Sequence, residues 1–130
     1  MSSRYALTFT ALPEHIDVMG HVNNAVWVQW MEVMAGAHWA ADAPAAFIDK
    51  YVWLVTRHEI DYRGNIGVGE SVVAETFIPN GPKGARFDRC VDFRNSAGKV
   101  IVSARSTWAM IDKASGRLCR VPAEVAAAFV

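Results

Sequence analysis

The sequence predicts an α+β fold in which a five-stranded antiparallel sheet wraps around one long, buried helix. The first observation is an apolar, proline-free stretch from Ala25 to about Ala41, which is typical of a helix buried on nearly every side. The second is one strand-like segment before this helix and four after it, with turn residues between successive segments. A single antiparallel sheet has few ways to bury such a helix other than on its concave face.

The first strand is predicted over residues 5–10, where apolar and polar residues alternate loosely before Pro13. The loop that follows is rich in turn-forming residues. Asn23 or Asn24 is placed to cap the helix, because an asparagine side chain can accept a hydrogen bond from an N–H group of the first turn.

Four strands are expected after a loop at residues 42–49. They are predicted over Trp53 to Tyr62, Val68 to Ile78, Ala85 to Arg94, and Lys99 to Ile111. In the third of these, alternate positions divide into two faces, one of which is formed by Phe87, Arg89, Val91 and Phe93. A hairpin turn is predicted at residues 95–98, and Pro122 suits the start of a short terminal helix that ends at Val130.

One apolar helix enclosed by five strands in this order is the layout of the hot-dog fold, although other α+β sandwiches meet the same constraints. We expect a single domain over residues 1–130, because the chain shows no internal repeat or linker and its length suits one core. The sheet leaves an edge open, and the hydrophobic fraction of 52% is high for a small monomer. We therefore expect a homodimer or a homotetramer.

The composition narrows the classes of partner. Thirteen basic and thirteen acidic residues cancel, so no overall field favours nucleic acid or a membrane surface. Cys90 and Cys119 lie far apart and outside metal-ligand spacing with the histidines, so no metal site is expected. The N-terminal segment lacks the apolar core of a signal peptide, and no run approaches the roughly 20 apolar residues of a membrane span. These features predict a soluble, cytoplasmic protein.

The segment HIDVMGHVNN, residues 15–24, places five side chains of catalytic character directly before the apolar helix. A carboxylate in this position can act as a nucleophile or a general base, while unpaired N–H groups of the first helical turn stabilise a developing oxyanion. This combination suits acyl transfer. Without further context, however, an aspartate before a helix is more often a turn or capping residue.

The longer segment HIDVMGHVNNAVWVQWMEVM resembles the active-site motif of hot-dog acyl-CoA thioesterases of the 4-hydroxybenzoyl-CoA thioesterase type. Its HVNN also resembles the motif of plant acyl-ACP thioesterases. RHEIDYRGNIGVGESVVAET resembles the family's second and third strands, and ARSTWAMIDKASGRLCRVP resembles its last strand and exit. The resemblance spans about Tyr5 to Glu124, and matching flanks in the right order make it far more specific than an isolated HVNN.

The resemblance implies that Asp17 is the catalytic carboxylate and that Gly20 lets the backbone turn tightly towards the thioester. It further implies that the backbone N–H near Asn24 polarises the thioester carbonyl, with the helix dipole behind it. His21 and Asn23 would then shape and orient the site. A hydrogen-bonded structural role for His21 is equally consistent with the sequence.

The resemblance also implies contacts with the substrate further along the chain. Lys83 and Arg86 would meet the phosphates of coenzyme A, although both are equally consistent with solvated loop charges. Trp27 is expected to belong to the core first and to the wall of an acyl pocket second.

Two positions refine this interpretation. Met19 stands where the plant enzymes carry asparagine, which favours the acyl-CoA branch. Glu32 lies with Gln29 and Gly36 on the one polar stripe of the helix, and we expect it to be a buried structural partner, of Arg57 or of a residue across a subunit boundary.

The resulting prediction is an acyl-CoA thioesterase without a cofactor, with Asp17 as nucleophile or general base and the helix N-terminus as oxyanion hole. Acyl carrier protein is an alternative carrier of the acyl group. Two other functions remain as alternatives. One is a hot-dog hydratase or dehydratase, for which the required aspartate and histidine spacing is absent. The other is a non-catalytic protein that binds acyl-CoA or acyl carrier protein, against which the presence of Asp17 argues.

Overall fold

The computed structural model describes residues 3–130. Its elements are β1 (Arg4–Thr10), the 3-10 helix η1 (Pro13–His15), α1 (Asn24–Asp42), α2 (Ala45–Ile48), β2 (Tyr51–Tyr62), β3 (Ser71–Phe77), β4 (Arg86–Arg94), β5 (Val100–Asp112) and α3 (Ala123–Phe129). Every predicted strand and both predicted helices are confirmed, with ends that shift by a few residues. The expected loop at residues 42–49 contains the short helix α2, which the sequence did not reveal because it is only one turn long.

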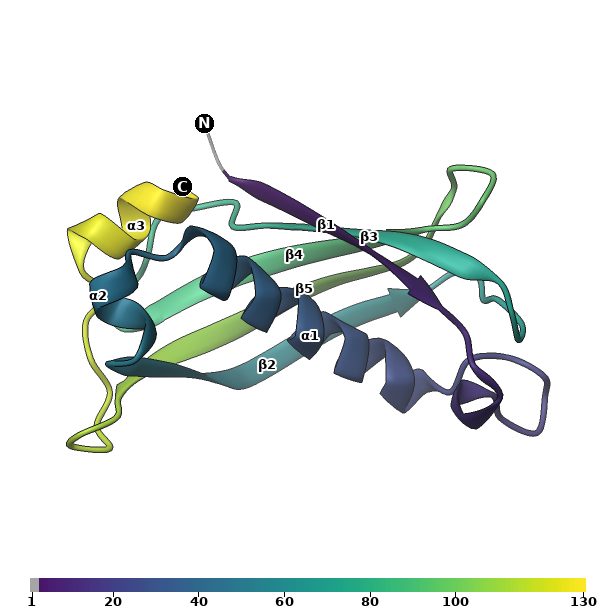
Figure 1. Cartoon of the computed structure of the whole chain (residues 1–130), viewed down its shortest axis with the longest axis horizontal. Coiled ribbons are helices and arrows are strands. Elements are labelled where there is room, and N and C mark those ends of the chain that lie inside the picture. Colours follow the sequence, from purple (N-terminus) through teal and green to yellow (C-terminus); the bar gives the residue numbers. More distant parts are fainter. Residues whose placement is uncertain (1–2) are drawn as a thin grey trace.

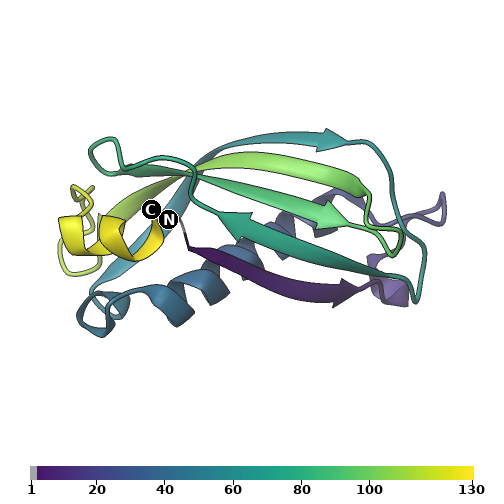
Figure 2. The same ribbon diagram turned by 90° about the horizontal axis from the view of Figure 1, so that it is seen from above.

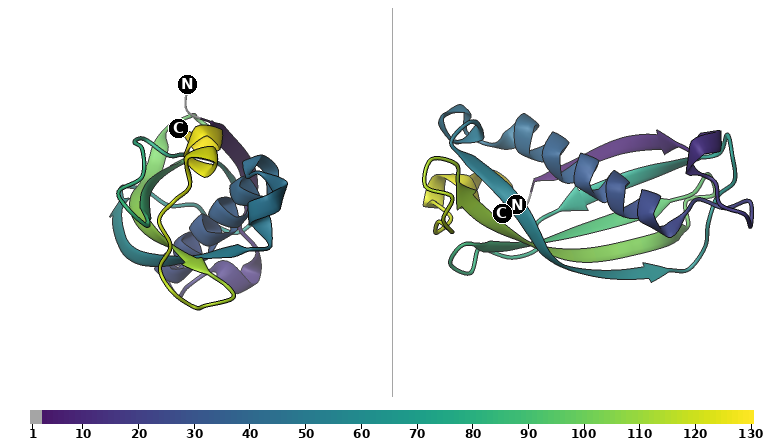
Figure 3. Two further views of the ribbon diagram at one scale, coloured as in Figure 1. Left: turned by 90° about the vertical axis from the view of Figure 1, so that its left-hand side faces the viewer. Right: turned by 90° about the horizontal axis from the view of Figure 1, so that it is seen from below.

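The strands form one sheet in the order β1-β3-β4-β5-β2, and each neighbouring pair is antiparallel. The two edge strands, β1 and β2, are the first two strands of the chain, and α1 lies between them in sequence (Figure 1). Seen from above, the strands splay as a curved layer with α1 on the far side (Figure 2). The end view shows the sheet curving around α1 (Figure 3). The predicted hot-dog layout is therefore confirmed.

The core forms where α1 meets the concave face of the sheet. Trp27 is fully buried and packs edge to face against Trp30 and Phe93, with ring centroids 5.2 and 5.0 Å apart. Aromatic pairs at these distances stabilise a core beyond the area that they bury. Along the helix, the buried positions are Val26, Trp27, Trp30, Met31, Met34, Ala35 and His38.

The expectation that α1 is buried on nearly every side is wrong for the described chain. The predicted polar stripe, which includes Gln29 and Gly36, is exposed, and Val33 beside it remains 52% exposed. The sheet curves around only one side of the helix, so the opposite side faces solvent. An apolar flank is therefore left open.

A second cluster closes one end of the molecule. Val125 and Phe129 of α3 are buried there against Tyr51, Phe87 and Met110 of the sheet. This end lies opposite the loop that precedes α1 (Figure 1). Within residues 3–130, no helix combines the length and the apolar character needed to cross a membrane.

Candidate functional site

The residues before α1 form a narrow loop over positions 15–23. Its two arms pair through an antiparallel bridge between Ile16 and Val22, and the Asp17 N–H donates to the His21 carbonyl at 2.8 Å. At the tip, Gly20 has a φ of +78°, a conformation that other residues rarely adopt. The loop is thus closed on itself, and the tight turn expected at Gly20 is present.

The Asp17 carboxylate is oriented by this loop. Its Oδ1 accepts hydrogen bonds from the Met19 N–H at 2.9 Å and from the His21 N–H at 3.3 Å. No group within residues 3–130 donates to Oδ2. One oxygen is therefore held while the other is available, which is the arrangement that a positioned base or nucleophile requires.

The first turn of α1 offers an unused donor beside this loop. Asn23 is the N-cap, since its side chain accepts from the Ala25 N–H at 2.9 Å, and its own N–H donates to the His15 carbonyl. Among the described residues, none accepts a hydrogen bond from the Asn24 N–H. This donor lies at the positive end of a 19-residue helix, so it suits a developing negative charge.

Two contacts that the sequence did not indicate fasten the loop and the helix start to the sheet. Asn65, in the connection between β2 and β3, accepts from the Val22 N–H at 3.1 Å and donates to the Val22 carbonyl at 3.2 Å. The Tyr62 hydroxyl donates to the Asn24 carbonyl at 3.3 Å. No local pattern signals either residue, because both partners are about 40 positions away.

The other predicted site residues are dispersed. The His21 imidazole is exposed and contacts Asp17 only through its backbone, while Trp27 is enclosed in the core. Lys83 and Arg86 lie near the start of β4, at the end opposite the Asp17 loop (Figure 1). Strand β4 alone spans about 26 Å at roughly 3.3 Å per residue. A single chain therefore does not bring these two cations to Asp17.

The expectation for Glu32 is wrong within the chain. Glu32 is exposed, and Arg57 pairs instead with Glu59, at 3.0 Å on the surface of β2. The β-bulge between Val55 and Arg57 shifts the register of β2 against β5, and Arg57 lies on the exposed side after it.

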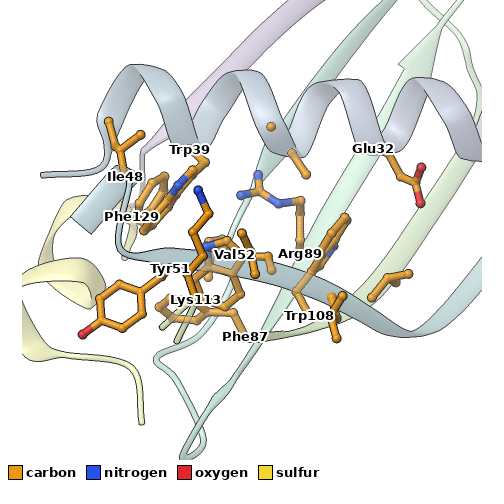
Figure 4. A pocket seen from close by; sticks show the side chains of 16 residues that line it. Glu32, Trp39, Ile48, Tyr51, Val52, Phe87, Arg89, Trp108, Lys113 and Phe129 are labelled. Carbon is orange, nitrogen blue, oxygen red and sulfur yellow. The ribbon is translucent and has the colours of Figure 1, made fainter. Parts of the chain in front are cut away.

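A cavity of about 620 Å³ lies between the second half of α1 and the adjoining strands. Its charged lining residues are Glu32, Arg89 and Lys113 (Figure 4). The remaining wall is apolar, and six of its residues are aromatic: Trp39, Tyr51, Trp53, Phe87, Trp108 and Phe129. The volume falls within the range of typical small-molecule sites.

Arg89 anchors a buried polar network beside this cavity. Its Nη1 donates to Nδ1 of His38 at 2.8 Å and to Oγ1 of Thr76 at 3.0 Å. Because arginine only donates, His38 Nδ1 is the acceptor and Nε2 carries the proton. Nε2 then faces Asp42 Oδ2 at 3.2 Å and Ser3 Oγ at 2.9 Å.

This network fixes the charges of its members. Burial, reinforced by the neighbouring Arg89, lowers the pKa of His38 to about 4, so the imidazole is neutral at pH 7. Burial lowers the pKa of Arg89 to about 10, which leaves the guanidinium protonated at pH 7. Arg89 is the lone charge on the apolar face of β4, and that irregularity was the sequence signal for it.

Comparison with known proteins shows the family to which the chain belongs. A model of the thioesterase-like superfamily matches residues 11–129. No curated protein matches the chain significantly in sequence.

Solved structures share the fold. An acyl-ACP thioesterase from Bacteroides thetaiotaomicron is 25% identical, with a TM-score of 0.80, and the match covers 91% of this chain and 49% of that one. The chain thus spans about half the length of that relative. A Staphylococcus aureus protein in complex with CoA is 12% identical over 98% of this chain and 82% of that one, with a TM-score of 0.83. A 1,4-dihydroxy-2-naphthoyl-CoA thioesterase from Synechocystis is 11% identical over 94% and 92%, with a TM-score of 0.78.

The His38 network makes stability depend on pH. The unfolded chain has the ordinary histidine pKa near 6.5, above the folded value of about 4, so the unfolded state binds more protons between these limits. Stability from this group is complete above pH 6.5 and falls as the pH drops towards 4. Between pH 8 and pH 5 the loss is about 2 kcal/mol. Urea unfolding of wild type and His38→Gln at both pH values checks this, and an equal pH-dependent loss in the two proteins would contradict it.

Proposed function

Because the chain belongs to the thioesterase-like superfamily, we propose that it hydrolyses an acyl thioester to a free acid and a thiol. The observation that carries the proposal is the Asp17 carboxylate, with Oδ1 held by two loop N–H groups and Oδ2 without a donor among residues 3–130. Asp17 lies in the loop that leads into α1, whose first N–H is unused among the described residues. A fixed carboxylate beside an oxyanion donor is what acyl transfer to water requires.

Two routes use the same atoms. In the first, Oδ2 of Asp17 takes a proton from water, and the water oxygen attacks the thioester carbonyl carbon. In the second, Oδ2 attacks that carbon itself, and water then hydrolyses the resulting anhydride. In both, the C–S bond breaks and the sulfur leaves as a thiolate that takes up a proton. Both routes develop negative charge on the carbonyl oxygen.

The Asn24 N–H is proposed to hold this oxygen. An N–H at the first helical position has no acceptor inside its own helix, and the aligned peptide dipoles of α1 add partial positive charge there. The Asn23 cap uses only the neighbouring Ala25 N–H, so it leaves the Asn24 N–H available. The side chains of His21 and Asn23 complete the site in this proposal.

We propose acyl-CoA as the substrate, with acyl carrier protein as the alternative. The Staphylococcus aureus protein with the same fold is in complex with CoA, and the Synechocystis protein is a thioesterase of an acyl-CoA. No cofactor enters the proposed chemistry. Cys90 and Cys119 are both free thiols, which fits the cytoplasm, where thiols stay reduced.

The working unit is proposed to be at least a dimer. Strand β2 is a long sheet edge paired on one side only, and Val52 and Leu54 are exposed on it. Lys83 and Arg86 lie at the end of the sheet opposite Asp17 of their own chain, and we propose that a second copy supplies them instead. A site at the subunit boundary would combine Asp17 of one chain with Lys83 and Arg86 of the other.

Replacement of Asp17 tests the chemistry. Asp17→Asn keeps the shape and the Oδ1 hydrogen bonds but removes the basic oxygen, so kcat for thiol release from acyl-CoA should fall by at least about 100-fold. The measurement is thiol trapping over a series of acyl chains. Asp49→Asn, an exposed aspartate outside the loop, is the matched control. Equal rates for wild type and Asp17→Asn would remove Asp17 from the mechanism.

Asn24→Pro tests the oxyanion donor separately. Proline is well tolerated at the first helical position and has no N–H, so the fold should persist while kcat falls by about 100- to 1,000-fold. Asn24→Ala removes the side chain and keeps the N–H, so its loss should be clearly smaller. If the two variants lose the same activity, the backbone N–H is not the donor.

The dimer has its own test in sedimentation. Wild type should sediment at twice the mass of one chain or more, whereas Leu54→Arg, which places a charge on the β2 edge, should shift it towards the monomer. Leu118→Arg is a matched control, because Leu118 is 54% exposed against 56% for Leu54 but lies outside β2. A monomeric wild type would contradict the proposal.

A further inference from the structure

The Arg89 guanidinium is a buried cation that lacks a counter-ion. Its residue is only 7% exposed, and no carboxylate within residues 3–130 forms an ion pair with it. Its nearest polar partners, His38 and Thr76, are neutral at pH 7. A buried charge is costly unless it is paired, so such an arginine invites an anion.

The orientation of the guanidinium leaves its binding edge open. Both hydrogens of Nη1 are used, one by His38 and one by Thr76, and these contacts hold the plane of the group. Nε and Nη2 share the opposite edge, and no described residue accepts from them. Two parallel N–H donors on one edge match the two oxygens of a carboxylate.

Arg89 is part of the wall of the cavity between α1 and β2. Figure 4 shows Arg89 projecting into that space, with Trp39 and Phe129 on one side and Trp108 on the other. Within residues 3–130, the fully buried side-chain polar atoms without a hydrogen bond belong to Trp27, His58 and Trp108. Nε and Nη2 of Arg89 have no acceptor in the described chain and are not among these atoms, so they are not fully buried.

The remaining charges do not pair with Arg89: the Asp42 carboxylate is separated from it by the His38 ring. Glu32 also lines the cavity, but it is exposed and forms no ion pair within residues 3–130. Lys113, on the other side, adds positive charge. The remainder of the wall is aliphatic and aromatic and favours an apolar ligand body, and the volume of about 620 Å³ accommodates one.

We propose that this cavity is a binding site for a carboxylate with an apolar body, whose two oxygens are held by Nε and Nη2 of Arg89. His38 and Thr76 are positioning residues, because they orient the guanidinium without touching the ligand. The site is separate from the Asp17 loop within one chain. Glu32, at its nearer side, is already about 12 Å along α1 from Asn24 at roughly 1.5 Å per residue.

Calorimetry with 6-phenylhexanoate and 6-phenyl-1-hexanol tests the proposal without any turnover. The two probes share an apolar body and differ only in the carboxylate. Wild type should bind the acid at least about tenfold more tightly than the alcohol, because charge-assisted hydrogen bonds form only with the acid. Equal affinities, or no saturable binding of either probe, would overturn the proposal. This readout does not depend on thioester hydrolysis.

Variants then locate the contact. Arg89→Lys keeps the charge but loses the two-pronged edge, so it should weaken acid binding about tenfold and leave alcohol binding within about threefold. Lys99→Met, which changes an exposed lysine between β4 and β5 outside the cavity, should leave acid affinity within about threefold. If Arg89→Lys keeps the full preference for the acid, the assignment to Arg89 is wrong. Should Arg89→Lys fail to fold, the comparison of the two probes in wild type still decides.

The bound carboxylate has two possible sources. The experiment that tells them apart rests on the proposed thioesterase activity, whereas the binding measurements above do not. It can be a free acid, or the far end of an acyl group that carries a second carboxylate. Hydrolysis of azelaoyl-CoA and nonanoyl-CoA separates them. A preference for azelaoyl-CoA in kcat/KM that Arg89→Lys abolishes supports the acyl group. Equal rates for both, with acid binding still dependent on Arg89, support the free acid.

Discussion

The burial of α1 on the concave face of one curved sheet is the constraint on which the rest of the structure depends. Trp27 lies at the centre of this contact and packs edge to face against Trp30 and Phe93. Because the helix must lie along the sheet, its N-terminus is fixed at one end of the strands. Residues 15–23 have to close there, and Asn65 fastens them to the sheet. The position of the Asp17 carboxylate is therefore a consequence of core packing, not of the loop alone.

The same constraint leaves one side of the helix uncovered. A single sheet of five strands encloses only part of α1, so an apolar flank, the β2 edge and a cavity remain along its second half. Positive charge therefore arises in two different ways along α1. At the start of α1, partial positive charge comes from the backbone, and the loop that carries Asp17 leads into it. Beside its C-terminal half, a full positive charge on Arg89 is held in an apolar setting by the neutral His38.

Much of this could be predicted from the sequence, for physical reasons that differ by element. The strands follow from alternation, and α1 follows from a long apolar run that only a sheet can bury. Asp17 and Asn24 are only seven positions apart in sequence, so both fall in the segment that leads into α1. Asn65 and the Arg89 network depend on contacts between distant segments, for which a single sequence carries no signal beyond a lone charge on an apolar face. The sequence predicted α1 to be buried on nearly every side, but the side that faces away from the sheet is exposed. Hydrophobicity alone does not say whether the same chain covers that side.

The central claim is that the Asp17 loop and the start of α1 act on one thioester carbonyl. A crystal structure with a non-hydrolysable acyl-CoA analogue, in which a methylene group separates the carbonyl from sulfur, tests it most directly. The carbonyl oxygen should lie about 3 Å from the Asn24 nitrogen, with Asp17 Oδ2 facing the carbonyl carbon. A carbonyl bound away from both groups, with the analogue otherwise ordered, would contradict the account.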